Sequence, residues 1–179
     1  MSQDALTVGQ PAPAFSLKTL GDQTVMLSDF RDKQIVLYFY PKDDTPGCTK
    51  EACSFRDELS AFTKANAVVL GVSCDSTTSH QRFADKFRLI FPLLSDPGAA
   101  VAKAYGVYKQ KSMYGRTYWG IERTTFIIDG QGRIAAIFPK VKVEGHTDEV
   151  LQAIRNPTAR APAEPPRARS RTATPRVSR

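Results

Sequence analysis

The chain has 179 residues and a net charge of +7, with 41% hydrophobic and 24% charged residues. This length fits one domain that buries roughly two thirds of its unfolded surface, and the composition excludes a fibrous protein. No apolar run approaches the roughly 20 residues of a membrane-spanning helix, and residues 1–10 lack the apolar core of a secretory signal, so we expect no membrane and a cytoplasmic location.

Hydrophobic patterning predicts alternating strands and helices. A continuous apolar run of strand length favours a strand buried on both faces, whereas apolar residues three or four positions apart favour a helix. Glycine, proline and aspartate clusters mark the turns between these elements. In chain order the predicted elements are a strand at 35–40, a helix through 52–62, a strand at 67–73, helices at 80–87 and 97–105, a hairpin at 125–138 and a helix at 147–154.

This order of elements predicts an α/β fold. A strand, a helix and a second strand, followed by helices and a hairpin, imply a central mixed β-sheet flanked by helices on both faces, in a thioredoxin-like layout. In such sheets the functional site lies at the carboxyl ends of the strands. The segment that leaves strand 35–40 and enters the next helix is therefore the first candidate for a functional site.

The predicted start of that helix carries a cysteine. Thr45 is placed to be the N-cap, and Pro46 then falls at the first helical position, where a missing N–H costs nothing. Cys48 becomes the third helical residue, among backbone N–H groups that have no partner inside the helix. Such a place favours an anion, and the thiolate is the reactive form of cysteine. We therefore predict a nucleophilic cysteine at position 48.

Ionisation alone does not make a thiol fast. An ordinary thiol with a pKa of about 8.5 is a few per cent ionised at neutral pH, so complete ionisation gains roughly thirtyfold at most. A faster reaction needs donors that orient the substrate, and the Thr45 hydroxyl and the backbone N–H of Gly47 or Cys48 are candidates. A nearby cation is also needed. Asp43 and Asp44 would oppose ionisation if they faced the sulfur, so we expect both to point to solvent.

The end of the chain has a different composition. Residues 156–179 contain six arginines and one glutamate, with no aromatic residue and no apolar periodicity. Such a segment cannot bury enough surface to offset the cost of ordering, so we expect a folded domain at 1–155 and a disordered basic tail at 156–179. The tail can add salt-dependent affinity for nucleic acid. Without aromatic side chains for base stacking, it predicts no specific nucleic-acid partner.

The residues around Cys48 resemble a known family. The string FYPKDDTPGCTKEAC holds Pro41, Thr45 and Cys48 in a Pro-x-x-x-Thr-x-x-Cys arrangement. It resembles the signature of the peroxiredoxins, specifically of the Q-type group also called bacterioferritin comigratory protein. Further matching strings are VVLGVSCDS, FPLLSDPGAAVAKAYGV and MYGRTYWGIERTTFIID, so that the resemblance covers roughly residues 6–154.

The resemblance implies a thiol-dependent peroxidase that reduces hydrogen peroxide and organic hydroperoxides without a metal or organic cofactor. It implies that Cys48 is the peroxidatic cysteine and that Thr45 and Arg123 orient peroxide and thiolate. It also places Pro41 and Gly47 at the substrate pocket. The three cysteines and two histidines, without a CxxC or HxxxH pattern, make a poor zinc set in any case.

The resemblance also implies a resolving cysteine. Cys53 would close an intramolecular disulfide with the oxidised Cys48, and thioredoxin or a similar dithiol protein would reduce it. In a regular helix, residues five apart have Cα atoms about 8–9 Å apart and about 140° apart round the axis, whereas a disulfide needs Cα atoms within about 7 Å. The first turns of the helix must therefore unwind in each cycle. We expect a monomer, because both cysteines lie in one chain.

Several alternatives stay open. A disulfide oxidoreductase uses related chemistry, but the CxxC motif is missing. Cys74, which departs from the family pattern, is interpreted as structural, with a second resolving thiol as the alternative. His80, His146 and Glu51 are interpreted as having no chemical role, with Glu51 on an exposed helix flank. Residues 113–119 are expected to form an aromatic-rich loop that either walls the active site or packs as a mobile segment.

Overall fold

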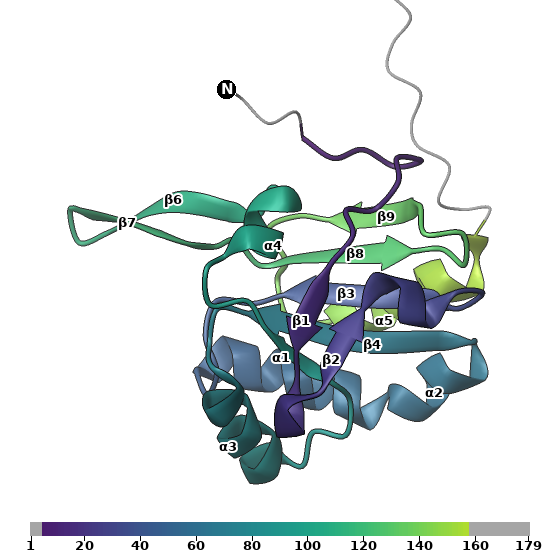
Figure 1. Ribbon diagram of the computed structural model, residues 1–179, viewed down its shortest axis with the longest axis horizontal. Helices are drawn as coiled ribbons and strands as arrows, with labels where there is room; N and C mark the ends of the chain where they lie inside the picture. The colour runs from purple at the N-terminus through teal and green to yellow at the C-terminus, as the bar shows by residue number, and fades with distance from the viewer. Residues whose placement is uncertain (1–4, 158–179) are drawn as a thin grey trace, which may run out of the picture.

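The computed structural model describes residues 5–157, and a mixed β-sheet forms their centre (Figure 1). Its strands are β1 (Ser16–Lys18), β2 (Thr24–Met26), β3 (Gln34–Phe39), β4 (Ala67–Ser73), β5 (Leu93–Ser95), β8 (Thr124–Ile128) and β9 (Ile134–Phe138). A separate hairpin consists of β6 (Tyr108–Met113) and β7 (Arg116–Ile121). The helices are α1 (Pro46–Asp57), α2 (Leu59–Lys64), α3 (Thr77–Phe87), α4 (Ala100–Ala104) and α5 (His146–Arg155), with short 3₁₀ helices η1 (Leu20–Asp22) and η2 (Leu27–Phe30).

The topology brings two loops to one edge of the sheet. Within the described residues the strands lie in the order β2-β1-β5-β4-β3-β8-β9. Strands β3, β4 and β5 run parallel, whereas β8 is antiparallel to β3, and β9 is antiparallel to β8. The carboxyl ends of β3 and β4 therefore point the same way, and the chain leaves them to enter α1 and α3 respectively. The predicted mixed sheet is confirmed.

Strand β3 divides the interior into two cores. Its alternate side chains point to opposite faces of the sheet, as in any strand. The members of one core are Val36, Tyr38 and, just beyond the strand, Tyr40. Those of the other are Ile35, Leu37 and Phe39. All six side chains are almost completely buried, which explains the continuous apolar run that predicted this strand.

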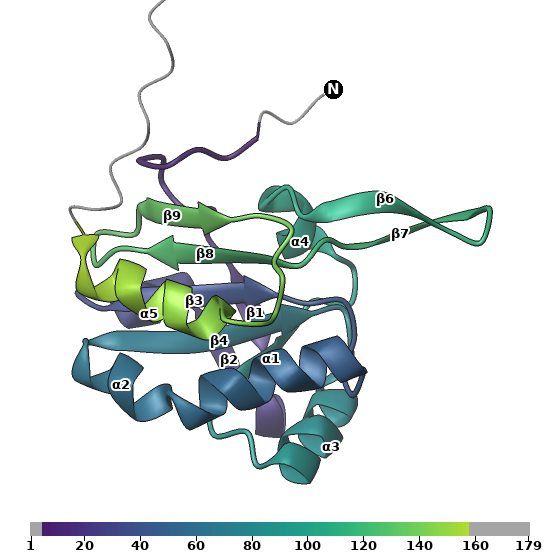
Figure 2. The same ribbon diagram turned by 180° about the vertical axis from the view of Figure 1, so that it is seen from behind.

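Helices cover both faces of the sheet. Figure 2 shows α1, α2 and α5 against one face, and buried residues of these helices and of α3 belong to a single core, among them Ala52, Phe55, Phe62, Phe83 and Val150. The opposite face is covered by α4 and the N-terminal segment, which contribute Ala102 and Phe15 to the second core. This arrangement confirms the predicted thioredoxin-like α/β fold.

Some elements differ from those that the sequence predicts. The helix expected through 52–62 is broken at Glu58, which separates α1 from α2. The loop expected at 113–119 is part of the β6–β7 hairpin, which projects from the body (Figures 1 and 2). Strands β1, β2 and β5 have three residues each. Such short strands carry too few residues for an alternating pattern to be recognised.

Two sequence predictions concern the remainder of the chain. The proposed basic tail at 156–179 lies, apart from its first two residues, outside the described residues. Within residues 5–157, no helix has both the length and the apolar character needed to cross a bilayer.

Candidate active site

Helix α1 begins where the sequence predicts. Thr45 is the N-cap, with an extended backbone (φ −99°, ψ 154°), and Pro46 occupies the first turn. The Thr45 side chain makes no capping hydrogen bond. Its hydroxyl instead donates to the backbone carbonyl of Lys42 at 2.9 Å. Thr45 thus holds the predicted N-cap position without a capping hydrogen bond from its side chain, and the first backbone N–H groups of α1 stay open to a ligand.

Cys48 lies in this first turn beside a cation. Its side chain is 1% exposed, and Nη2 of Arg123 donates to its Sγ at 3.3 Å. Arg123 follows β7 and precedes β8, so the fold brings it to the cysteine from a distant part of the sequence. A Cβ atom at Gly47 would lie only 3.2 Å from Nη2 of Arg123. Glycine at this position leaves room for the guanidinium.

Glu51 completes a charged cluster around Arg123. Nη1 of Arg123 donates to Oε1 of Glu51 at 2.9 Å, so one guanidinium contacts both the thiol and the carboxylate. Glu51 is 1% exposed, and the prediction of an exposed flank is wrong. Its position three residues after Cys48 puts both on one helix face. Burial raises the pKa of Glu51 to about 7, although Arg123 acts in the opposite direction.

Burial and neighbouring charges change the pKa values of Arg123 and Tyr38. Partial burial acts to lower the pKa of Arg123, but Glu51 and Cys48 outweigh it, and the pKa is raised. Among the described residues, Tyr38 Oη and Glu51 Oε2 are buried without a hydrogen-bond partner. Burial, followed by the charge of Glu51, raises the pKa of Tyr38. The site thus holds one cation among groups that favour its charged form.

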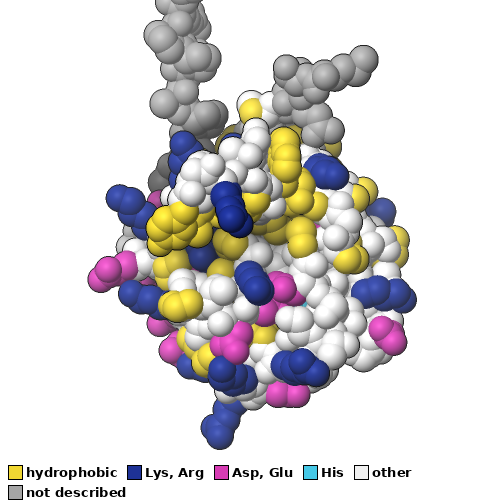
Figure 3. Space-filling model, turned by 90° about the vertical axis from the view of Figure 1, so that its left-hand side faces the viewer, with side chains coloured by type: hydrophobic (Ala, Val, Ile, Leu, Met, Phe, Trp, Pro, Cys, Tyr) yellow, Lys and Arg dark blue, Asp and Glu magenta, His cyan; other side chains and the backbone are white. Residues whose placement is uncertain are grey.

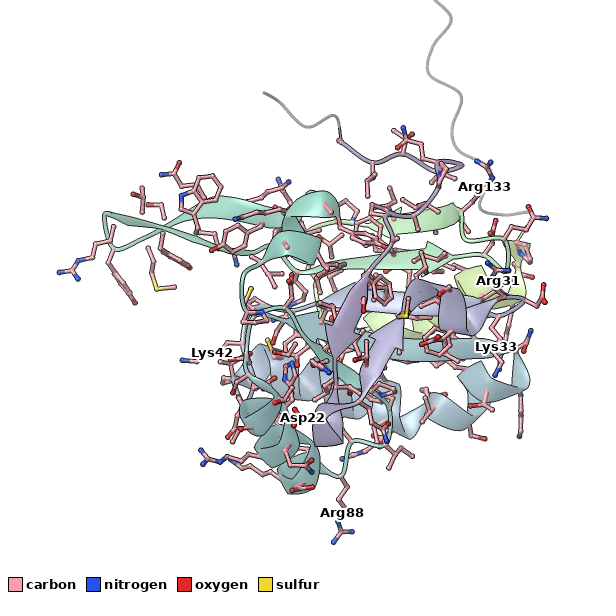
Figure 4. All side chains as sticks on the ribbon, in the orientation of Figure 1. Asp22, Arg31, Lys33, Lys42, Arg88 and Arg133 are labelled. Carbon is pink, nitrogen blue, oxygen red and sulfur yellow. The ribbon has the colours of Figure 1, made fainter. Side chains whose placement is uncertain are left out.

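The two aspartates before α1 behave differently. Asp44 is exposed and forms an ion pair with Lys86 at 2.8 Å, as a solvent-facing residue can. Asp43 is buried, so the expectation that it points to solvent is wrong. It accepts hydrogen bonds from Tyr40 Oη (2.6 Å) and Ser79 Oγ (2.8 Å), and it faces His80 Nδ1 at 2.7 Å. Lys42, in the same loop, points outward (Figure 4).

Neither histidine is unpartnered. His80 is fully buried and contacts Asp43, and His146 Nε2 lies 2.8 Å from the Thr125 hydroxyl. Both histidines therefore have polar partners inside the fold, which the sequence analysis did not predict. His80 shares one helix face with Phe83, three residues on, and this spacing was a signal that it is buried. Among residues 5–157, no group of three or more Cys, His, Asp or Glu side chains could hold a metal ion.

The other two cysteines are free thiols. Cys53 is partly exposed on α1, and both it and Cys48 are helical. Cys74 follows β4 and packs partly buried against the second core. Burial, with the charges of Asp96 and Asp75, raises the pKa of Cys74. This environment fits its interpretation as a structural residue, because a reactive cysteine needs a positive environment that lowers the pKa.

The sequence and fold of the chain are similar to those of known proteins. Residues 8–137, well over half of the chain, match the model of the AhpC/TSA family. The chain belongs to this family. The putative peroxiredoxin bcp of Coxiella burnetii is 54% identical over 147 residues, which cover 82% of this chain and 97% of that protein. The peroxiredoxin Bcp of Bacillus subtilis is 48% identical, with 84% and 96% covered.

Solved structures of similar proteins place the chain more narrowly. A mutant of Xylella fastidiosa PrxQ has a TM-score of 0.81 and 41% identity, covering 86% of this chain and 98% of its own. The bacterioferritin comigratory protein of Xanthomonas campestris, described for its alkyl peroxide reduction activity, has a TM-score of 0.76 and 43% identity, covering 79% and 90%. This protein is therefore a peroxiredoxin of the Bcp, or Q, type.

Sequence reasoning missed part of this peroxiredoxin's site. Cys48, Thr45 and Arg123 were predicted, and the structure brings Cys48 and Arg123 into contact and puts Thr45 at the start of the same helix. Gly47 adjoins Arg123, whereas Pro41 is exposed at the far end of the loop. Glu51 was missed, although its spacing from Cys48 was a usable signal. The Asp43–His80 contact was also missed, and it has no local signal.

Proposed function

We propose that this peroxiredoxin reduces hydroperoxides with Cys48 as the attacking thiolate and Cys53 as the resolving thiol. The observation that carries the proposal is the 3.3 Å contact between Arg123 and the buried sulfur at the start of α1. A guanidinium and the open N–H groups of a helix both stabilise negative charge. The Cys48 sulfur is thus placed where an anion is favoured and where a substrate can approach the helix end.

Peroxide cleavage follows from this geometry. The Cys48 thiolate attacks one peroxide oxygen, the O–O bond breaks, and the leaving oxygen takes a proton to become water or an alcohol. Cys48 is left as a sulfenic acid. The Thr45 hydroxyl donates its hydrogen bond to the Lys42 carbonyl, so the lone pairs of its oxygen can accept a hydrogen bond from the peroxide. The backbone N–H groups of Gly47 and Cys48 and the Arg123 guanidinium stabilise the charge that develops on the leaving oxygen.

Resolution requires a change of structure. The Cys53 thiol condenses with the sulfenic acid, a disulfide forms and water leaves. Both cysteines are helical in α1, so the first turns must open before the sulfurs can meet. A dithiol protein such as thioredoxin then attacks the disulfide and returns both thiols. The partly exposed Cys53 is the sulfur that such a protein reaches more easily.

The β6–β7 hairpin supports organic hydroperoxides as substrates alongside hydrogen peroxide. Lys111 of β6 lies near enough to the site that, after burial, the charge of Arg123 lowers its pKa. Tyr118 is its cross-strand partner and shares its face, because paired residues point to the same side. Figure 3 shows hydrophobic side chains with lysine and arginine among them on the face toward which the hairpin projects. The exposed ring of Tyr118 is proposed to contact the alkyl group of an organic hydroperoxide.

The functional unit is proposed to be a single domain at 1–155 that acts as a monomer. The peroxidatic and resolving cysteines lie in one helix of one chain, so no second subunit is needed for the disulfide. The basic tail at 156–179 is proposed as an accessory extension outside the catalytic unit. Three free thiols fit a reducing compartment such as the cytoplasm.

Peroxide turnover with matched cysteine variants tests the function. The parent protein should consume hydrogen peroxide and cumene hydroperoxide in the presence of thioredoxin, thioredoxin reductase and NADPH. Cys48→Ser should abolish turnover of both. Cys74→Ser removes a thiol whose pKa is raised by burial and by Asp96 and Asp75, and it should keep turnover within about twofold. Turnover that survives Cys48→Ser would contradict the proposal.

A further inference from the structure

A buried polar network holds the loop that precedes α1. The Asp43 carboxylate receives hydrogen bonds from Tyr40 and Ser79 and contacts His80, all within 2.6–2.8 Å. The Asp43 backbone N–H donates to the carboxylate of Asp75 at 2.9 Å. The side chains of His80 and Asp43 are 0% and 4% exposed. The loop is thereby attached to α3 and to the segment that precedes it.

His80 uses both of its ring nitrogens. Nε2 lies 3.0 Å from the backbone carbonyl of Leu94, which can only accept, so Nε2 carries a hydrogen. Nδ1 faces a carboxylate oxygen of Asp43 that also accepts from Ser79. A single proton between Nδ1 and the Asp43 carboxyl completes the 2.7 Å contact. The two side chains therefore form a buried hydrogen-bonded pair, and removing one partner leaves a polar atom of the other buried without that hydrogen bond.

The position of this pair connects it to the reaction. Asp43 lies one residue after Lys42, whose carbonyl fixes the Thr45 hydroxyl, and five residues before Cys48. His80 lies on α3, which the opening of α1 does not have to move. When the first turns of α1 unwind for resolution, the loop that leads into them must shift relative to α3. Contacts from the loop to α3 therefore stabilise the closed helix over the open one.

We propose that Asp43 and His80 are positioning residues of the peroxidatic centre. Their buried hydrogen-bonded pair anchors the loop before α1 to α3, which aligns Thr45 and Cys48 for peroxide and slows the opening that Cys53 needs. The inference rests on the proposed function, because the two residues are assigned to the balance between the reaction of Cys48 with peroxide and the formation of the disulfide with Cys53. A slower opening leaves the sulfenic acid of Cys48 exposed for longer to a second peroxide, which oxidises it to the sulfinic acid and is itself reduced to water.

Opposite effects on the two steps distinguish this role from a merely structural one. His80→Gln and Asp43→Asn each replace one partner of this pair by an amide of similar volume. Each should slow the reaction of Cys48 with peroxide by about three- to tenfold and speed disulfide formation by about tenfold, since hydrogen bonds to charged groups are among the stronger ones in proteins. The sulfinic fraction at high peroxide should fall in parallel. The double variant breaks the same link, so its two rates should shift in the same directions as those of the single variants.

Rapid quenching with an alkylating reagent, followed by mass spectrometry, measures all three species of Cys48 over time. Lys86→Gln is the matched control, because it removes the exposed ion pair of Asp44 between the same loop and the same helix. Exposed pairs contribute little, so it should change either rate by less than about twofold. Thermal unfolding of each variant reports global stability separately.

The outcomes separate the inference from the proposed function. A parent protein that forms no Cys48–Cys53 disulfide overturns both. The inference alone is overturned if the parent forms this disulfide but His80→Gln and Asp43→Asn slow both steps or change neither. It is also overturned if these two variants behave like Lys86→Gln. If His80→Gln and Asp43→Asn do not fold, Ser79→Ala provides the test, because it removes one hydrogen bond to Asp43 and leaves the contact between Asp43 and His80 in place. Ser79→Ala should slow the reaction of Cys48 with peroxide and speed disulfide formation, each by about two- to threefold. Unchanged rates overturn the inference.

Discussion

Cys48 and Cys53 lie five positions apart in α1 and face different surroundings. Cys48 is 1% exposed and contacts Arg123, whereas Cys53 is partly exposed. A helix turns by about 100° per residue, so the two side chains leave its axis about 140° apart. In the proposed cycle, the closed helix therefore serves the attack on peroxide, and α1 has to open before Cys53 can reach the Cys48 sulfur.

Replacing the resolving thiol should separate the two half-reactions. Cys53→Ser should keep the first reaction with peroxide within about threefold of the parent rate, because the substitution leaves Arg123 and the helix start unchanged. Thioredoxin-dependent cycling should stop, and Cys48 should accumulate as sulfinic acid under excess peroxide. Stopped-flow peroxide consumption and intact mass measure the two effects. Normal cycling of this variant would instead assign resolution to Cys74 or to an external thiol.

The forked guanidinium of Arg123 should be irreplaceable. It contacts the Cys48 sulfur and the Glu51 carboxylate at once, and the single ammonium of lysine cannot reproduce both contacts in the same geometry. Arg123→Lys should lower kcat/KM for hydrogen peroxide by about 100-fold, the usual effect of removing one donor to a developing charge. Arg116→Lys, on the exposed end of β7, is the control and should change it by less than about twofold. Equal losses in both variants would refute a specific role.

Glu51 should make stability depend on pH. Its pKa is raised from 4.5 to about 7 in the folded protein, so its contribution to stability is fully present below about pH 4.5 and is lost as the pH rises through 7. Glu51→Gln removes this dependence. Relative to the parent, the variant should gain stability between pH 5 and pH 8, by at most about 3 kcal/mol.

Urea unfolding of the reduced proteins at these two pH values measures the gain. Glu58→Gln, an exposed carboxylate at the end of the same helix, is the control and should show no such gain. A difference between Glu51→Gln and the parent that is the same at both pH values would contradict the assignment of the raised pKa to Glu51.

The two faces of the β6–β7 hairpin should differ in their effect on substrate choice. Tyr118 shares the face of Lys111, which senses the charge of Arg123, whereas Trp119 points to the other side and stacks on Tyr108 at 5.9 Å. Tyr118→Ala should raise the KM for cumene hydroperoxide by about three- to tenfold and leave that for hydrogen peroxide within about twofold. Trp119→Ala should change neither. A loss confined to Trp119→Ala would instead assign contact with the alkyl group to the opposite face of the hairpin.

The sequence predicts those parts of the fold and site that depend on local chemistry. The buried strands β3 and β4 follow from continuous apolar runs, and the start of α1 follows from Thr45 and Pro46. The polar partners that allow Asp43 and Glu51 to be buried could not be predicted in this way, because each partner lies far along the chain. His80 lies 37 positions from Asp43, and Arg123 lies 72 positions from Glu51. Without those partners, a charged residue next to a helix start is normally solvated.

The family resemblance supplied what local reasoning lacked. The need for a cation near Cys48 follows from the chemistry of a thiolate, but only the resemblance pointed to Arg123, and the structure confirms the contact. The hairpin that precedes Arg123 was missed because its strands are mostly exposed and carry polar residues on both faces. Such strands lack the alternation of apolar and polar residues that marks a half-buried sheet.

The most direct test of the account is the cysteine connectivity after a single turnover. Reduced protein is treated with one equivalent of hydrogen peroxide, alkylated, digested and analysed by mass spectrometry. The account predicts one disulfide, between Cys48 and Cys53, with Cys74 recovered as an alkylated thiol. A disulfide that joins Cys48 to Cys74, or recovery of Cys48 as an unreacted thiol, would contradict it.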